Sequence, residues 1–324
     1  VFLCGCLLAA FIATGVLTRE IENRTALTVV SKPVSRPMFV FGKFLGVAGA
    51  MLLCTTAMSL VFLLVEQHTV LETVRDPVHV PVIVFGGLAV VIATAVATWC
   101  NYFYGMNFTS TIICTATPLL LVAYVLSLLF APDFTPYPRS RLGASFEPDL
   151  IKAIGVMGMA IMVLVAVAIA ASARLGQIMT LIVTLGAFLV GLLSDWLFGR
   201  RIVALQDLWL QRARARGLTE PQEIVREFVL VTGEVQRSPT PEIRDVPTVP
   251  LAELAEGGER LAMAGWKLLH AVVPNFQVLW LSDALTQQRL IPMSYVWTSL
   301  TYGLRYVVAA LALAVFLFQR REVG

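Results

Sequence analysis

The sequence predicts an all-α, polytopic bundle of transmembrane helices. Hydrophobic residues make up 58% of the 324 residues and charged residues only 14%, whereas a soluble domain carries about a quarter charged residues. Stretches of about 20 apolar residues recur, and each is long enough to cross roughly 30 Å of hydrocarbon as a helix. No stretch has the alternating pattern, about ten residues long, of an outer-membrane barrel strand. Helices must therefore satisfy the backbone polar groups within the lipid.

The apolar runs predict seven spans. In chain order they are Val1–Leu17, Met38–Val65, Val82–Tyr102, Phe108–Ala131, Ile151–Ala173, Gln177–Phe198 and Pro292–Phe318. The chain begins inside an apolar run and lacks the basic residues that open a signal peptide. We therefore expect an N-terminal truncation that removes one earlier helix.

Basic residues in short loops mark the cytoplasmic side of a membrane protein. Such residues lie between the first two spans and again after the last span, and six spans, an even number, separate the two groups. Both groups are therefore predicted to be cytoplasmic. They are Arg19, Arg24, Lys32 and Arg36 in the first group and Arg320 and Arg321 in the second. The segment 199–291 is then extracytoplasmic; its early arginines do not oppose this, because loops longer than about 60 residues largely escape the rule.

Three regions follow from this topology. Residues 1–198 form the transmembrane domain, with a cytoplasmic coupling elbow at 18–43. Residues 199–291 form an extracytoplasmic, partly interfacial segment, in which the apolar pattern of Val203–Ala215 predicts a helix on the membrane surface. A similar helix is predicted over Leu261–Leu285, interrupted at Pro274. Residues 292–324 form the last span and a cytoplasmic terminus.

The elbow is the most informative part of the sequence. A short amphipathic helix begins at Glu20, the stretch 31–36 interrupts it, and the next span follows. Pro33 and Pro37 bias the residues before them away from helix, and Ser35 can cap the helix that enters the membrane. The pattern predicts a rigid cytoplasmic elbow that passes force from a soluble partner to the spans. An ordinary basic loop that only fixes topology is the alternative.

The order of residues in the elbow resembles the cytoplasmic coupling segment of ABC-2 type (type 2 ABC exporter) permeases. The matching positions are Glu20, Thr25, Ser31, Pro33, Val34, Ser35, Arg36, Gly42, Lys43 and Gly46. The triplet Pro274-Asn275-Phe276, Tyr302 and the stretch 318–322 are similar to the last external helix, final span and basic terminus of that family. Two features depart from the family: an additional hairpin beyond its usual six spans, and Arg24 where a Gly often precedes the Thr.

The resemblance implies a permease subunit in a bacterial cytoplasmic (inner) membrane. It pairs with a second permease subunit, identical or different, and with ATP-binding subunits that dock on the elbow. The implied coupling residues are Arg19, Glu20, Glu22, Thr25, Ser31, Pro33, Val34, Ser35 and Arg36. The chain has no GxxxxGK[ST] phosphate loop, so ATP and Mg are expected on the partner ATPase and no cofactor on this chain. Besides these subunits, membrane lipid is an expected partner and nucleic acid is not.

Arg305 is a charge well inside the last predicted span, where insertion costs at least about 2.5 kcal/mol. It either lines a translocation path or fixes a gate, paired with Asp195, or its side chain snorkels to the interface. The five cysteines are odd in number and absent from the external segment, and the three histidines are scattered. Disulfides and metal sites are therefore not expected.

Two other functions remain open. A membrane-embedded enzyme of lipid or envelope metabolism requires clustered Asp, Glu or His side chains near an interface. An assembly factor uses the elbow to bind a cytoplasmic partner without transport. Of the three, the permease is favoured, and the chain is not expected to be an enzyme itself.

Overall fold

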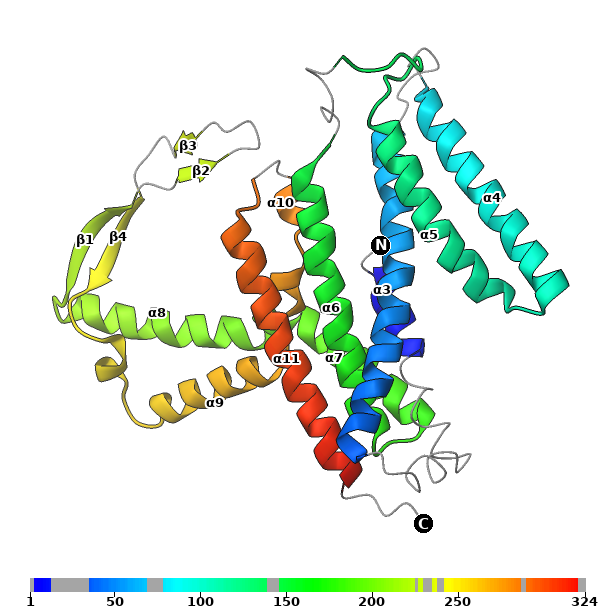
Figure 1. Cartoon of the computed structure of the whole chain (residues 1–324). Coiled ribbons are helices and arrows are strands. Elements are labelled where there is room, and N and C mark those ends of the chain that lie inside the picture. Colours follow the sequence, from blue (N-terminus) through cyan, green and yellow to red (C-terminus); the bar gives the residue numbers. More distant parts are fainter. Residues whose placement is uncertain are drawn as a thin grey trace.

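The computed structural model describes residues 3–12, 35–68, 78–138, 146–224, 227–229, 235–237, 242–286 and 290–319. Long apolar helices dominate it (Figure 1). They are α3 (Arg36–His68), α4 (Val80–Tyr104), α5 (Phe108–Ser127), α6 (Pro148–Ser172), α7 (Gln177–Leu192) and α11 (Met293–Gln319). Among the described residues, five helices are long and apolar enough to cross a membrane, or six if α7 is counted with the bent helix that follows it.

The ends of the α4–α5 hairpin show why these boundaries are readable from sequence. Pro81 occupies the first turn of α4, where a missing N–H costs nothing, and Gly105 ends the helix with a left-handed φ of 63°. The Asn107 side chain then caps α5 by accepting from the backbone N–H groups of Thr109 and Ser110. The predicted spans at 82–102 and 108–131 are confirmed as helices, to within a few residues.

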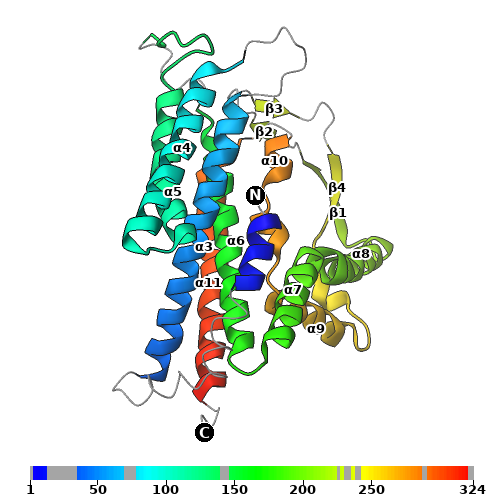
Figure 2. The same ribbon diagram turned by 90° about the vertical axis from the view of Figure 1, so that its right-hand side faces the viewer.

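The main core lies where α6 passes between α3 and α11 (Figures 1 and 2). Ile161, Leu164 and Ile169 of α6 are completely buried there, as expected for a helix that is apolar all round. A second cluster joins the upper half of α3 to the α4–α5 hairpin, through residues such as Leu63 and Leu120. The hairpin thus packs mainly on α3, and Leu150 at the start of α6 belongs to the same cluster.

Hydrogen bonds from two arginines join three chain segments at one end of the bundle. The Arg36 Nη1 donates to the carbonyl oxygen of Gln319 at 2.7 Å, and the Arg174 Nε donates to that of Leu317 at 3.1 Å. The start of α3, the turn between α6 and α7, and the end of α11 therefore lie together; we call this region the α3–α11 end. This arrangement agrees with the even number of crossings predicted between the elbow and the C-terminus.

The predicted span at 177–198 was wrong as a continuous helix. The helix α7 ends at Leu192, and the chain bends by 55° into a π-helical turn, η2 (Asp195–Gly199), and α8 (Arg200–Ala215). With 16 residues, α7 is about 24 Å long, less than the roughly 30 Å of a hydrocarbon core. For the first predicted span, the structure describes a helix over Leu3–Ile12, and the rest lies outside the described residues. The count of seven spans is not confirmed.

The segment after α8 contains strands that the all-α prediction did not include. The strand β1 (Thr219–Ile224) pairs antiparallel with β4 (Glu242–Pro247), and β2 (Glu227–Val229) pairs with β3 (Val235–Arg237). Each sheet has only two strands. Such ribbons need no buried apolar face, so their sequences lack the alternation that identifies a strand.

The predicted helix at 203–215 is confirmed as α8, which runs with α9 (Glu259–Val272) crosswise to the bundle (Figure 1). The predicted position of α8 on a membrane surface stays a prediction, and its apolar side also packs on protein. Trp209 is buried against Leu254 and Met263, whereas Val203 and Leu208 stay exposed. On α9, too, apolar side chains at helical spacing are exposed, and these suit a membrane interface. They are Leu261, Leu268 and Val272.

Candidate functional site

The structure describes only the last two of the predicted coupling residues. Arg19, Glu20, Glu22, Thr25, Ser31, Pro33 and Val34 lie outside the described residues. Ser35 directly precedes α3, and its carbonyl oxygen accepts from the Phe39 backbone N–H at 3.1 Å. Ser35 therefore occupies the position of an N-cap, as the sequence predicts. Arg36 is the first residue of α3.

Arg36 joins the start of α3 to the end of α11. Its guanidinium donates to the last helical carbonyl, that of Gln319, where the helix dipole favours a cation. Beside this bond the rings of Phe39 and Phe318 stack, with centroids 5.6 Å apart, and both side chains are buried. The Lys43 Nζ lies 5.7 Å from the Phe39 ring centroid, within cation–π range. Displacement of the elbow would therefore act directly on α11.

A second polar cluster lies at the bend after α7. The Asp195 Oδ1 accepts from the Asn275 Nδ2 at 2.9 Å and lies 2.9 Å from the His270 Nε2. The Asn275 backbone N–H donates to the Tyr302 hydroxyl at 2.8 Å. The triplet at 274–276 is thus held between the bend and α11. We call Asp195, His270, Asn275, Phe276 and Tyr302 the Asp195 junction.

Residues 274–276 pack closely against α7 at Gly191. Phe276 is completely buried, with its ring centroid 5.6 Å from that of Phe188. A Cβ on Gly191 would lie 2.5 Å from both the Pro274 carbonyl oxygen and the Phe276 ring. Gln277 adds a hydrogen bond to this contact: its Nε2 donates to the Leu192 carbonyl oxygen at 2.8 Å. That bond satisfies a carbonyl group left over at the end of α7.

Tyr302 and Tyr306 lie one turn apart on α11 and hold the same region from the other side. The Tyr306 hydroxyl donates to the Ala271 carbonyl oxygen at 2.6 Å, near the end of α9. The two rings meet edge to face, with centroids 4.9 Å apart. The last helix therefore contacts the elbow end of α3 through its C-terminus and the Asp195 junction through its middle.

The structure does not bring Arg305 and Asp195 together. Asp195 is bound by His270 and Asn275 instead, and Arg305 is exposed on α11 with no ion pair among the described residues. Arg305 lies twelve residues after Met293, about 18 Å along the helix. A charge at this depth needs water or a partner chain, so Arg305 remains a candidate for a translocation path.

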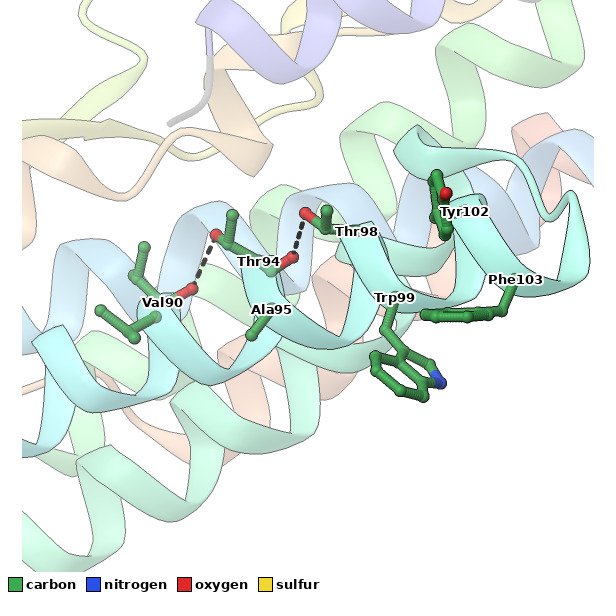
Figure 3. Close-up of a pocket in the computed structure, with 8 residues that line it drawn as sticks. Val90, Thr94, Ala95, Thr98, Trp99, Tyr102 and Phe103 are labelled. Carbon is green, nitrogen blue, oxygen red and sulfur yellow. Dashed lines mark hydrogen bonds between the residues drawn. The ribbon is translucent and has the colours of Figure 1, made fainter.

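The outer face of α4 carries the aromatic cluster in Figure 3. Trp99, Tyr102 and Phe103 are largely exposed, and they border a shallow hollow of about 580 Å³. The hydroxyls of Thr94 and Thr98 donate to backbone carbonyls one turn earlier, both at 2.8 Å. Exposed aromatic rings near a helix end are typical of the membrane–water interface. We therefore interpret this face as a lipid contact, whose hydroxyl donors are already satisfied.

The described residues were also compared with the requirements of disulfides and metal sites. All five cysteines are free. The described residues contain no group of three His, Cys, Asp or Glu side chains placed to hold a metal ion. Polar clusters occur at the α3–α11 end, at the Asp195 junction and where Arg212 binds Glu259 between α8 and α9. Sequence reasoning located the first two only in part: it identified Arg36, Asp195, Asn275 and Tyr302, but not His270 or Gln277.

Comparison of the chain with protein-family models, with curated proteins and with solved structures gives no match in any of the three. The structure itself defines the class: a multi-pass integral membrane protein of apolar α-helices, in which the short apolar helix α7 bends into α8 at a polar junction.

Proposed function

We propose that the chain is the permease subunit of an ATP-binding cassette transporter of the ABC-2 type, an exporter of the bacterial cytoplasmic membrane. In this proposal a separate ATPase subunit binds ATP and Mg and docks on the elbow at 18–43. A second permease subunit, identical or different, completes the path. The elbow motif supports the family, and the bond from Arg36 to Gln319 is the observation that carries the mechanism.

The mechanism uses α11 as a rod between two sites. Arg36 and Phe39 contact its C-terminal end, while Tyr302 and Tyr306 hold the polar turn at the bend of α7. From residue 302 to residue 319 the helix is about 26 Å long. Closure of the ATPase subunits would move the elbow, and α11 would transmit that motion to the Asp195 junction. The junction would then change the bend between α7 and α8, which opens or closes the path.

The coupling step is tested by the double variant Glu20→Ala with Arg36→Ala in the assembled complex. We expect it to lose the dependence of ATP hydrolysis on transport, with the spans still folded, because Glu20 is predicted, and Arg36 observed, to lie outside the packed core. The matched control is Arg244→Ala, which removes an exposed cation from β4. ATPase activity and transport are measured in the same proteoliposomes.

Single variants separate docking from transmission. Arg36 also holds α11, so Arg36→Ala alone should uncouple the complex while the ATPase subunit stays bound. Glu20→Ala alone should weaken binding of that subunit. Normal coupling in the double variant would disprove the proposed role of the elbow.

A further inference from the structure

An apolar groove of about 730 Å³ runs between α3 and α11 at the α3–α11 end. Its walls come from both helices, and the exposed large apolar side chains among them are Met38, Phe41, Val308 and Phe316. Ser35 and Gln319 line the groove at the end where Arg36 joins the two helices. The walls of the groove are thus apolar, and only its end near Ser35 and Gln319 is polar.

The polar end is also cationic. A guanidinium has five N–H donors, and the bond to Gln319 uses one donor of the half-buried Arg36 side chain. A ligand that fits both parts needs a hydrocarbon portion for the walls and an anionic group for Arg36.

We propose that this groove is a binding site for an anionic phospholipid. One acyl chain lies between Phe41 and Val308, and the phosphate accepts from the Arg36 guanidinium. Basic pockets between transmembrane helices on the cytoplasmic side commonly bind anionic head groups. A helix of a second protein would fill the apolar walls but leave the charge of Arg36 unmatched. The bound lipid bridges α3 and α11 at the contact made by Arg36 and Gln319.

This inference goes beyond the proposed transport function and needs no ATPase subunit. The full chain is purified in a mild detergent and titrated with dioleoyl phosphatidylglycerol, or with dioleoyl phosphatidylcholine, which has the same acyl chains and no net charge. Retained lipid is counted by native mass spectrometry. We expect phosphatidylglycerol to bind at least about fivefold more tightly, since one arginine near an anionic lipid contributes a factor of about five.

Two variants test the two parts of the site. Arg36→Gln should remove the preference for phosphatidylglycerol, and Arg244→Gln, which removes a cation from β4, should preserve it. Ala312→Trp should block both lipids by filling the groove, because Ala312 lines it. Ala309→Trp places the same ring elsewhere on the exposed surface of α11 and should leave binding unchanged.

Equal binding of the two lipids would overturn the proposal. So would a preference that survives both Arg36→Gln and Ala312→Trp, or inorganic phosphate that displaces the lipid fully at equal concentration. Should Arg36→Gln fail to fold, Ala312→Trp against Ala309→Trp decides the question, since both variants keep Arg36.

Discussion

Gly191 is the residue at which a single added carbon should matter most. A Cβ there would meet the Pro274 carbonyl oxygen, a backbone atom that cannot rotate away, and the buried Phe276 ring. We expect Gly191→Ala to destabilise the protein by about 1–3 kcal/mol, the usual cost of overpacking. Thermal unfolding in detergent measures the change.

The control for this prediction is Gly186→Ala on the same helix, where an added Cβ meets no described atom within 4 Å. It should be neutral or slightly stabilising, because alanine is the better helix former. Equal stability of the two variants would show that Gly191 is not the seat of the Pro274–Phe276 turn.

Glu259 gives the contact between α8 and α9 a dependence on pH. Donors from Arg212, from the Glu256 backbone N–H and from Trp209 lower the pKa of the Glu259 carboxyl from its ordinary 4.5 to about 2. Because this pKa is lowered, the ionised Glu259 carboxylate contributes its full stabilisation of the α8–α9 contact above pH 4.5. That stabilisation is lost as the pH falls toward 2. We expect the α8–α9 pair to loosen over that range.

Spin labels at the exposed positions Leu208 and Leu268 measure this, through the width of the distance distribution between them. Glu259→Gln should broaden the distribution already at pH 7, and the difference from the unmodified chain should shrink below pH 4.5. The exposed Glu253, changed to Gln, is the control and should leave the pH response intact. A distribution that stays narrow to pH 2 would contradict this account.

At the scale of single residues, sequence reasoning found the polar groups but not all of their partners. Asp195 and Arg305 were paired in the prediction because both are charges in or near spans. The observed partners, His270 and Asn275, lie 75 and 80 residues from Asp195 in the chain. The bend after α7, which no local propensity marks, brings them together. Arg36 belongs to the elbow motif and could be identified from the sequence. Its acceptor could not, because every residue has a backbone carbonyl group and no residue type marks the one that is used.

Among the elements, the bend between α7 and α8 depends on Asn275. Its side chain donates to Asp195 and accepts from the Gln277 backbone N–H, and its own N–H donates to Tyr302. Asn275→Ala removes both side-chain bonds and leaves Asp195 with His270 as its described partner, at about 0.5–1.5 kcal/mol for each lost hydrogen bond. We therefore expect the angle between α7 and α8 to become variable.

Spin labels at Ile182 on α7 and Val203 on α8 report that angle. Asn275→Ala should widen their distance distribution, whereas Gln222→Ala, on the exposed face of β1, should not. An unchanged distribution would mean that the packing of Phe276 alone fixes the bend.

The long helices were predictable because their apolar runs, prolines and caps agree at each boundary. Asn107 and Gly105 mark the α4–α5 turn in the sequence as clearly as in the structure. The end of α7 was missed because Leu192 and Leu193 continue an apolar run in the sequence. We attribute the bend to a tertiary contact, the packing of the turn at Pro274 against Gly191. The two-stranded ribbons were missed because Thr219–Ile224 has neither alternation nor β-branched enrichment.

For the whole molecule, the account makes α11 the link between the elbow and the Asp195 junction. Removal of both arginine contacts to its C-terminal carbonyls, by Arg36→Gln with Arg174→Gln, should free that end. We expect increased hydrogen exchange over the last two turns of α11, with little change near Tyr302. Protection that is unchanged at residues 312–319 would show that Phe39 and Phe318 hold the end without the arginines.

The central claim, that the elbow couples this chain to a separate ATPase, is tested most directly by affinity purification of the intact protein from its native membrane. The account predicts that an ATP-binding subunit copurifies with ATPase activity, and that Glu20→Ala lowers its recovery while Arg244→Ala does not. If no ATP-binding subunit copurifies under several mild detergents, the permease assignment is contradicted.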